Sequence, residues 1–222
     1  MQAGQKMKRG GIECCLFPLS YMYITQGENG STSHQGSLAI DFAGWGINGR
    51  ILKCVYYAPF SCKLVAKFGT TSPLLIWESI NPVLCIDGTI TKVCIGVAHD
   101  DQTPMFYIGM TRNQGDILGH TGTYGNVTGD HVHMEVCKGA YTGCHQNSSG
   151  VWVLNNQEHI YNVLAVNGTT IVQGNNYPWE LFMDFDIGGL GKFPWVLYSK
   201  KLRERRKVSR YWHFFNFIIL LW

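Results

Sequence analysis

The chain has 222 residues, of which 45% are hydrophobic, 13% aromatic and 15% charged. A chain of this length and apolar content fits one sizeable domain with a tail, or two small domains, and can build a true hydrophobic core. Even the apolar last ten residues, from His213, are far fewer than the roughly 20 that a membrane-spanning helix needs, so no such helix is expected.

The net charge of +3 is divided unevenly along the chain. From Lys192 onward there are eight Lys or Arg residues against one Glu, whereas the rest of the chain has ten against fourteen acidic residues. The body is therefore mildly acidic and the tail strongly basic. A basic segment with an aromatic end could adsorb to an anionic membrane or wall polymer, although a linker toward a further module is the simpler interpretation. No recognised fold supports specific nucleic-acid binding.

Short apolar or alternating runs, bounded by turn-forming residues, predict β-strands along the whole body. The 26 glycines and the scattered Asn-Gly, Asp-Gly and Gly-Thr pairs indicate many turns. The spacing of these runs predicts an all-β fold built on one antiparallel β-sheet domain. In chain order, the expected strands span residues 19–26, 38–43, 55–58, 62–66, 74–78, 90–98, 114–119, 129–136, 152–154 and 160–166.

Composition predicts three parts to the chain. These are an N-terminal extension at 1–18, a domain at 19–183, and a Gly-rich linker with a basic and aromatic tail at 184–222. Basic residues and an apolar run near the N-terminus faintly imitate a secretory signal. The run is short, contains Pro18 and precedes no small-x-small cleavage site, so no signal peptide is expected.

Eight cysteines are present, and none are spaced as C-x-x-C, which argues against a zinc ribbon or a thioredoxin-type site. Several lie in apolar strand-like runs, as Cys94 does between Val93 and Ile95. We expect most of them to act as small buried hydrophobic residues. A disulfide between Cys137 and Cys144 across a hairpin is an open alternative.

The segment from Gly129 to Val136, Gly-Asp-His-Val-His-Met-Glu-Val, is the most informative in the chain. Successive side chains of a strand point to opposite faces. The apolar side chains should therefore pack on one face, while His131, His133 and Glu135 share the other. Two imidazoles on one strand face are well placed to hold a metal ion, although a solvent-exposed polar face would show the same alternation.

Three further residues offer catalytic or metal-binding groups from separate strands. His34 and Asp41 bracket a loop that enters a strand, and His99 ends another strand. A hydrolytic zinc site uses about three N or O ligands and one open position for water. Each residue by itself also fits a surface loop or turn. Their combination with His131 and His133 favours a metal-dependent hydrolase.

In these residues the chain resembles the lysostaphin/LytM-type zinc metallopeptidases, which cut peptidoglycan cross-bridges. That family has a His and an Asp in its first strands, a mid-chain His at a strand end, and a late Gly-rich segment ending in His-x-His-x-Glu. The resemblance spans roughly residues 21–166. The matching segments are His34-Gln35-Gly36 with Ala39-Ile40-Asp41, then Val97-Ala98-His99, then Gly119 to Glu135.

The resemblance implies an antiparallel β-sheet domain with a cleft that holds one zinc ion. His34, Asp41 and His133 would be the zinc ligands. His99 and His131 would flank the reacting water and the scissile carbonyl, where an imidazole that titrates near pH ~6.5 can move a proton.

Two features depart from the family pattern. The His-to-Asp spacing is seven residues rather than four, through the insertion of residues 37–39, and Asp100 follows His99 where the family usually has Leu. Residues 119–129 are expected to border the cleft as a loop whose missing side chains let a substrate backbone approach. Glu135 is expected to orient a metal ligand. The histidines without a matching position are expected to be non-catalytic: His120, His145, His159 and His213.

The expected function is therefore zinc-dependent hydrolysis of peptide bonds in bacterial peptidoglycan, for wall lysis or phage penetration. The expected location is a virion tail or the bacterial wall. One alternative is a non-catalytic virion or wall-binding module of the same fold, and another is a metal-dependent hydrolase of some other small substrate. The sequence leaves the cleaved bond, the host and the oligomeric state open.

Overall fold

A computed structural model of the protein describes residues 1–164 and 171–178. Nearly all the regular structure in these residues is β, which confirms the predicted all-β class. None of the helices among them is long and apolar enough to cross a bilayer. The predicted linker and tail at 184–222 lie outside the described residues, so the predicted domain limits stay predictions.

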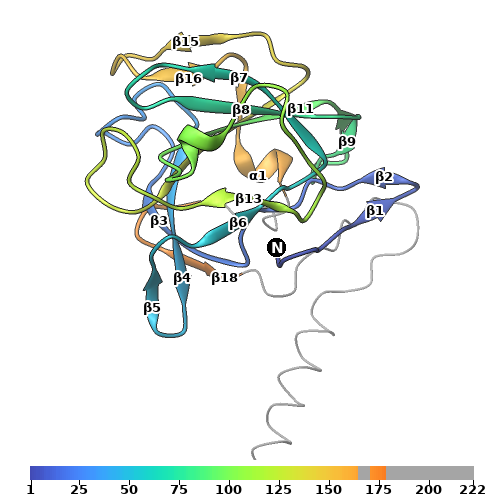
Figure 1. The fold of residues 1–222 in the computed structure, drawn as a ribbon, viewed down its shortest axis with the longest axis horizontal. Helices are drawn as coiled ribbons and strands as arrows, with labels where there is room; N and C mark the ends of the chain where they lie inside the picture. The colour runs from blue at the N-terminus through green and yellow to red at the C-terminus, as the bar shows by residue number, and fades with distance from the viewer. Residues whose placement is uncertain (165–170, 179–222) are drawn as a thin grey trace, which may run out of the picture. The chain divides into compact units, whose positions relative to one another are not determined.

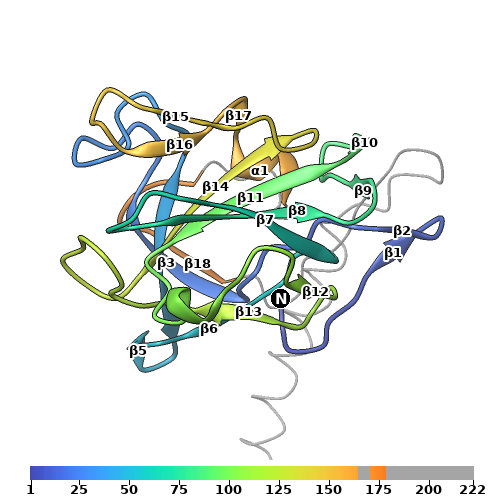
Figure 2. The ribbon, with the colours of Figure 1, turned by 45° about the horizontal axis from the view of Figure 1, so that its top comes forward.

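The largest sheet has ten antiparallel strands, and eight of them follow the order β12-β7-β8-β11-β14-β4-β3-β18 (Figures 1 and 2). Two short strands, β5 (Gly49–Ile51) and β17 (Gln157–Glu158), pair with β4 and β14. In the order of the sheet, the eight strands span Thr111–Arg112, Cys62–Phe68, Leu74–Ser79, Val93–Ala98, Val132–Lys138, Ile40–Gly46, Tyr21–Gln26 and Asn176–Pro178.

Four two-stranded sheets surround this large sheet (Figure 2). Part of the predicted N-terminal extension packs into the body, since the backbone of Cys14 forms an isolated β-bridge with that of Leu84 and both side chains are buried. The pairs are β1 (Lys8–Arg9) with β2 (Ile12–Glu13), β9 (Val83–Leu84) with β10 (Ile90–Thr91), β6 (Val55–Tyr57) with β13 (Ile117–His120), and β15 (Cys144–Gln146) with β16 (Trp152–Leu154).

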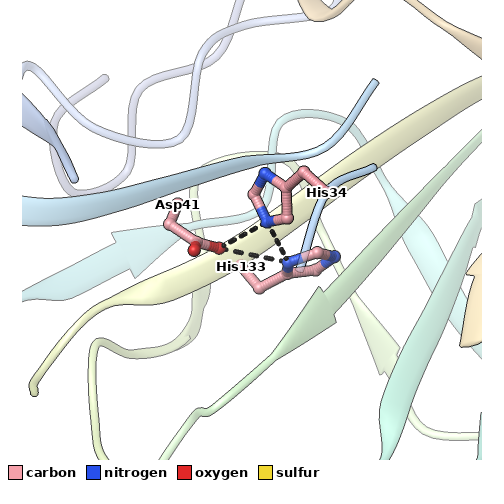
Figure 3. Close-up of side chains that lie close together, drawn as sticks. All are labelled: His34, Asp41 and His133. Atoms are coloured by element: carbon pink, nitrogen blue, oxygen red, sulfur yellow. Dashed lines mark hydrogen bonds and ion pairs between the residues drawn. The ribbon is translucent and has the colours of Figure 1, made fainter. Parts of the chain in front are cut away.

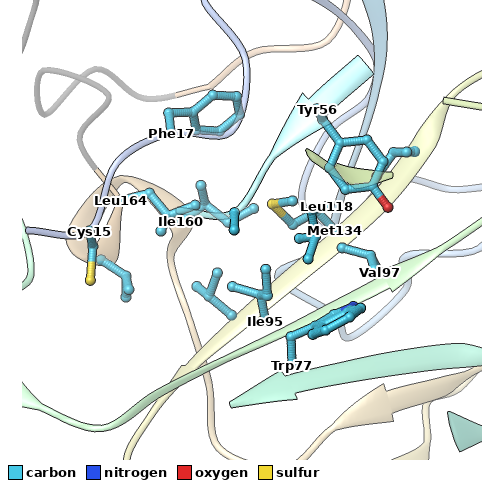
Figure 4. Packing of buried hydrophobic residues seen from close by; sticks show 14 of the residues in the cluster. Cys15, Phe17, Tyr56, Trp77, Ile95, Val97, Leu118, Met134, Ile160 and Leu164 are labelled. Carbon is cyan, nitrogen blue, oxygen red and sulfur yellow. The ribbon is translucent and has the colours of Figure 1, made fainter. Parts of the chain in front are cut away.

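Alternation along the strands builds the main core (Figure 4). Val132, Met134 and Val136 of β14 are fully buried in this core, as their shared strand face predicts. Burying an aliphatic side chain of this size is worth roughly 1.5–3 kcal/mol. The same packing leaves the opposite face of β14 to its polar residues, which fixes the register of the functional strand.

The predicted strand at 160–166 is wrong. Residues Ile160–Val163 form the short helix α1, closed by a hydrogen bond of 2.8 Å from the Leu164 N–H to the Ile160 carbonyl. Ile160, Val163 and Leu164 are all buried, and their spacing of three and four places them on one helix face. A short apolar run does not distinguish a strand from a buried helical turn.

All eight cysteines are free thiols in the structure, so the alternative of a Cys137–Cys144 disulfide is wrong. Cys54 and Cys144 are half-buried. The other six are buried, as expected of small hydrophobic residues: Cys14, Cys15, Cys62, Cys85, Cys94 and Cys137.

Candidate metal centre

Strand β14 lies between β4 and β11 in the large sheet and brings three distant parts of the chain together. In the pairing with β4, His133 lies opposite Asp41. In the pairing with β11, His133 lies opposite Ala98, the last residue of that strand. His99 therefore leaves the sheet beside His133. The two pairings thus bring the backbones of four of the five predicted site residues close together: Asp41, His99, His131 and His133.

The loop between β3 and β4 brings His34 to the same point. The His34 N–H donates to the Gly30 carbonyl at 3.1 Å, and the Ser37 N–H donates back to the His34 carbonyl at 2.8 Å. Gly36 supports this turn with φ of 72°, a left-handed conformation that glycine adopts without strain. Residues 37–39, the insertion relative to the family pattern, complete the turn, so the longer spacing still lets His34 reach Asp41.

The side chains of His34, Asp41 and His133 meet in a tight triangle (Figure 3). His34 Nε2 lies 3.2 Å from Asp41 Oδ1 and 3.1 Å from His133 Nδ1, and the third side, from His133 Nδ1 to Asp41 Oδ1, is 3.1 Å. A tetrahedral zinc ion with bonds of about 2.0–2.1 Å separates its ligands by about 3.3 Å. The three atoms thus fit one face of such a site.

Each ligand atom in the triangle is oriented by a partner on the far side of its residue. The His34 Nδ1–H donates to the Gly27 carbonyl at 2.9 Å, and the His133 Nε2–H donates to Glu135 Oε1 at 2.9 Å. Gln26 Nε2 donates to Asp41 Oδ2 at 3.0 Å. Because the outer nitrogen of each imidazole holds a hydrogen, the inner nitrogen can present its lone pair to a metal.

The electrostatics of the triangle favour a cation. Burial by itself would lower the pKa of His133, but hydrogen bonds and charge from Asp41 and Glu135 outweigh it and raise the pKa to about 10. Burial would raise the pKa of Asp41, yet its hydrogen bonds with His133 and His34 hold it well below its usual range. Two buried carboxylates around two imidazoles therefore retain a positive charge between them, as a proton or a metal ion.

His99 and His131 lie beside the triangle, with ring centroids 4.8 Å apart. The His131 Nδ1–H donates to the Gly129 carbonyl at 2.8 Å, and its Nε2 lies 3.8 Å from Asp41 Oδ2. The His99 Nδ1–H donates to the Tyr124 carbonyl at 3.1 Å. Both rings thus keep Nε2 as the nitrogen without a hydrogen.

The backbone and the charge state of His99 are both unusual. Its φ of 70° is left-handed, which is uncommon for a residue other than glycine and is typical of functional sites. Burial and the neighbouring His133 and His131 lower the pKa of His99 to about 4. His99 is therefore neutral at neutral pH and can accept a proton or a hydrogen bond.

The five residues predicted from sequence converge at a groove of about 1150 Å³. His34 is the one of the five that lies behind the groove surface, fully buried. Hydroxyl-bearing residues from strand β3 and from four loops make up much of the lining: Thr25, Ser31, Thr32, Ser33, Thr70, Thr71, Ser72, Thr128 and Ser149. Phe68 and Trp152 form an aromatic pair at the lining, with ring centroids 4.8 Å apart.

The Gly-rich loop 119–129 borders the groove as expected, but its glycines serve two purposes. Gly129 lines the groove, and a Cβ there would meet only Arg50, at 3.7 Å. A Cβ at Gly119 would instead overlap the Asp100 carboxylate and the Tyr56 hydroxyl, and one at Gly122 would overlap Asp101. These two glycines allow close approach of the chain to itself rather than of a substrate.

Sequence reasoning missed two residues that contact the site. Gln26 is buried and donates a hydrogen bond to Asp41. The sequence did contain a signal for it, because Gln26 is a polar residue on the buried face of β3 that Met22 and Ile24 share. Ser72 Oγ lies 3.3 Å from His99 Nδ1 and accepts the Asn126 N–H at 3.2 Å. No pattern in the sequence marks Ser72.

The remaining histidines of the described residues lie outside the cluster. His145 of β15 contacts Asn155, and His159 contacts Glu28. His120 lies at the end of β13, where its backbone N–H donates to Asp100. His213 falls outside the described residues. Glu135, fully buried, makes the expected contact with His133.

Comparison with known proteins places the chain beside a phage protein. It is 39% identical over 171 residues to "Morphogenesis protein 1" of Bacillus phage B103, a match that covers 77% of this chain and 45% of the relative. The chain thus spans about half the length of that curated relative. No protein-family model matches the chain.

Similar solved structures include a zinc-containing peptidase from Vibrio cholerae, at 19% identity and a TM-score of 0.39, covering 62% of this chain and 37% of the peptidase. The catalytic domain of lysostaphin from Staphylococcus simulans has 16% identity and a TM-score of 0.37, covering 55% of this chain and 82% of that domain. The M23 metalloprotease pseudoalterin, from the deep sea, has 16% identity and a TM-score of 0.43, covering 77% and 98%.

Proposed function

We propose that this chain is a zinc-dependent endopeptidase of the lysostaphin/LytM type, which hydrolyses peptide bonds in bacterial peptidoglycan. The observation that carries the proposal is the triangle of His34 Nε2, Asp41 Oδ1 and His133 Nδ1, with sides of 3.1–3.2 Å at the base of an open groove. The roles follow as proposed from sequence. His34, Asp41 and His133 hold one zinc ion, and His99 and His131 handle the proton.

A bound zinc ion supplies Lewis acidity, which lowers the pKa of a water ligand toward ~7 and polarises a carbonyl. The protein's own groups do the rest. Glu135 and the Gly27 carbonyl hold the two imidazole ligands in the required tautomer. His131 or His99 can take a proton at Nε2 from the attacking water and return it to the departing amine. The hydroxyl-lined groove can hold an extended peptide through hydrogen bonds.

The phage relative supports a place for this activity in a virion, where a wall-cutting enzyme would open the cell wall. Its printed name also supports the second candidate, a non-catalytic virion module that keeps the fold. A structural module does not need two unligated imidazoles beside a metal triangle. The retained pair, His99 and His131, therefore favours the enzyme.

Incubation of purified protein with purified peptidoglycan tests the proposal. New free amino termini should appear with one equivalent of zinc and disappear with a chelator. His133→Ala should abolish the release, because the triangle loses one ligand. His145→Ala is the matched control, since it removes a histidine from β15 outside the cluster, and it should keep full activity.

The outcomes separate the candidates. Absence of new amino termini from the zinc-loaded protein would sink the enzyme and leave the virion module. Full activity of His133→Ala would refute the metal assignment. Release that persists after complete zinc removal would point to a hydrolase of another kind.

A further inference from the structure

The groove holds one strong cation, Arg50, close to the proposed reaction centre. Among the described residues that line the groove, Arg50 is the one Lys or Arg and Asp41 is the one Asp or Glu. Asp41 belongs to the metal triangle, where its charge is neutralised by the imidazoles and would be by zinc. Because Asp41 is already paired, no other carboxylate of the groove lining competes with an anionic group of a ligand for Arg50.

Arg50 is held beside His131 by two strands. It lies on β5, opposite Trp45 of β4, the same strand that carries Asp41. Its guanidinium donates a hydrogen bond from Nη2 to the carbonyl of Asp130, the residue directly before His131. Consecutive Cα atoms are about 3.8 Å apart. A group bound to Arg50 thus lies in the same groove as His131, next to the residue that precedes it.

The carboxylate of Asp130 forms no ion pair with the Arg50 guanidinium. Asp130 Oδ1 accepts the Thr121 hydroxyl at 2.6 Å, and Oδ2 accepts the Lys53 backbone N–H at 2.9 Å. The guanidinium donates to the Asp130 carbonyl, and in the part of the chain that the structure describes no carboxylate forms an ion pair with it. Lys53, the next cation along, differs, because its ammonium is paired with Asp101 at 3.3 Å.

A guanidinium offers five N–H donors in a planar fork that matches a carboxylate. One donor of Arg50 is used on the Asp130 carbonyl, which aims the group without satisfying it. Arg50 is exposed on β5, so a ligand can reach the remaining donors from the groove.

We propose that Arg50 is a specificity-determining residue that binds a free carboxylate on the substrate peptide, one or two residues from the scissile bond. This inference rests on the proposed function and names its substrate class, peptides with an acidic residue or a free carboxyl end at that place. Peptides whose carboxyl groups are carboxamides would be poorer substrates. A charged hydrogen bond of this type, once lost, changes kcat/KM by about tenfold or more.

The test uses cross-linked muropeptide dimers with free carboxyl groups, and the same dimers after carbodiimide-driven amidation. The zinc-loaded wild type should cleave the free dimers at least tenfold faster in kcat/KM. Arg50→Gln should lose this preference, by slowing on the free dimers alone. Lys53→Gln is the matched control, which removes an equal charge nearby and should keep the preference.

Equal cleavage of both dimers by the wild type would overturn the inference while the proposed function stands. A preference that persists in Arg50→Gln would overturn it as well. If neither dimer is cleaved, the proposed function fails, and fluorescence polarisation of labelled dimers decides the inference separately. An Arg50-dependent preference in binding would then support the carboxylate site, and equal binding of both dimers would refute it.

Discussion

Substitution of Glu135 by Gln changes the charge of one buried group and little of its shape. The two oxygens of Glu135 accept three hydrogen bonds, from His133 Nε2 at 2.9 Å, the Leu154 N–H at 2.6 Å and Gln157 Nε2 at 2.7 Å. An amide has one oxygen and cannot accept from both sides. Whichever way it turns, an NH₂ group faces an N–H donor.

The size of the effect follows from the tautomer of His133. If the amide oxygen serves Leu154 and Gln157, its NH₂ group faces His133 Nε2, which must then give up its hydrogen. The hydrogen moves to Nδ1, the atom that faces Asp41 and the metal position. Loss of such an outer partner typically weakens metal binding 10–100-fold, or about 1.4–2.7 kcal/mol. The free energy of unfolding of the zinc-free protein should also fall by about 3 kcal/mol, because the buried pair of His133 and Glu135 is broken.

Competition against a fluorescent zinc chelator measures the affinity, and urea denaturation of the chelated protein measures stability. Gln157→Ala is the control, because it removes a neutral donor to Glu135 without contacting His133; it also removes the Gln157 hydrogen bonds to Ser37 and to the Leu38 N–H. With three hydrogen bonds lost, it should cost about 2–4 kcal/mol of stability and weaken zinc binding less than Glu135→Gln does. Wild-type zinc affinity in Glu135→Gln would refute the tautomer reasoning.

Three further predictions concern protons, catalysis and packing. Because the zinc-free pKa of His133, about 10, lies above the unperturbed 6.5, its contribution to stability is complete below pH 6.5 and is lost as the pH rises toward 10. Zinc binding at pH 8 should therefore release about one proton, and calorimetry in buffers of different ionisation enthalpy would contradict this if it finds none. His99→Ala should bind zinc normally but lose about 10²–10⁴-fold in kcat on muropeptides, and an unchanged kcat would remove His99 from the site. Gly119→Ala should destabilise the fold by about 3 kcal/mol, because its Cβ would overlap Asp100, and an unchanged urea midpoint would contradict that packing.

The strand that carries the site was predictable in detail because its two faces are chemically distinct. Period-two alternation placed Val132, Met134 and Val136 in the core and Glu135 against His133, and the structure confirms both. Both outcomes depend on which face of a single strand each side chain takes, so the alternation of side chains is enough to predict them.

The meeting of His34 with His133 came from a family resemblance, not from periodicity. The two residues are 99 positions apart, and three hydrogen-bonded turns between β3 and β4 determine where the His34 side chain lies. Local rules cannot locate a loop side chain over that separation. They also cannot tell a short buried helix from a strand, which is why residues 160–163 were predicted wrongly.

The role of Arg50 was beyond sequence reasoning for another reason. Its guanidinium stays available because the Asp130 carboxylate accepts from the Thr121 hydroxyl and the Lys53 backbone N–H and forms no ion pair with Arg50. Which cation in a fold is paired and which remains available depends on tertiary contacts. A count of charges along the chain cannot supply that information.

X-ray absorption at the zinc edge tests the central claim most directly, because it reports the atoms that surround the metal. The protein should bind one equivalent of zinc, with a first shell of nitrogen and oxygen at about 2.0–2.1 Å and outer-shell scattering from two imidazoles. His133→Ala should lose one imidazole from that signal, or lose the metal. A zinc–sulfur distance of about 2.3 Å, or no bound zinc at all, would contradict a site built from His34, Asp41 and His133.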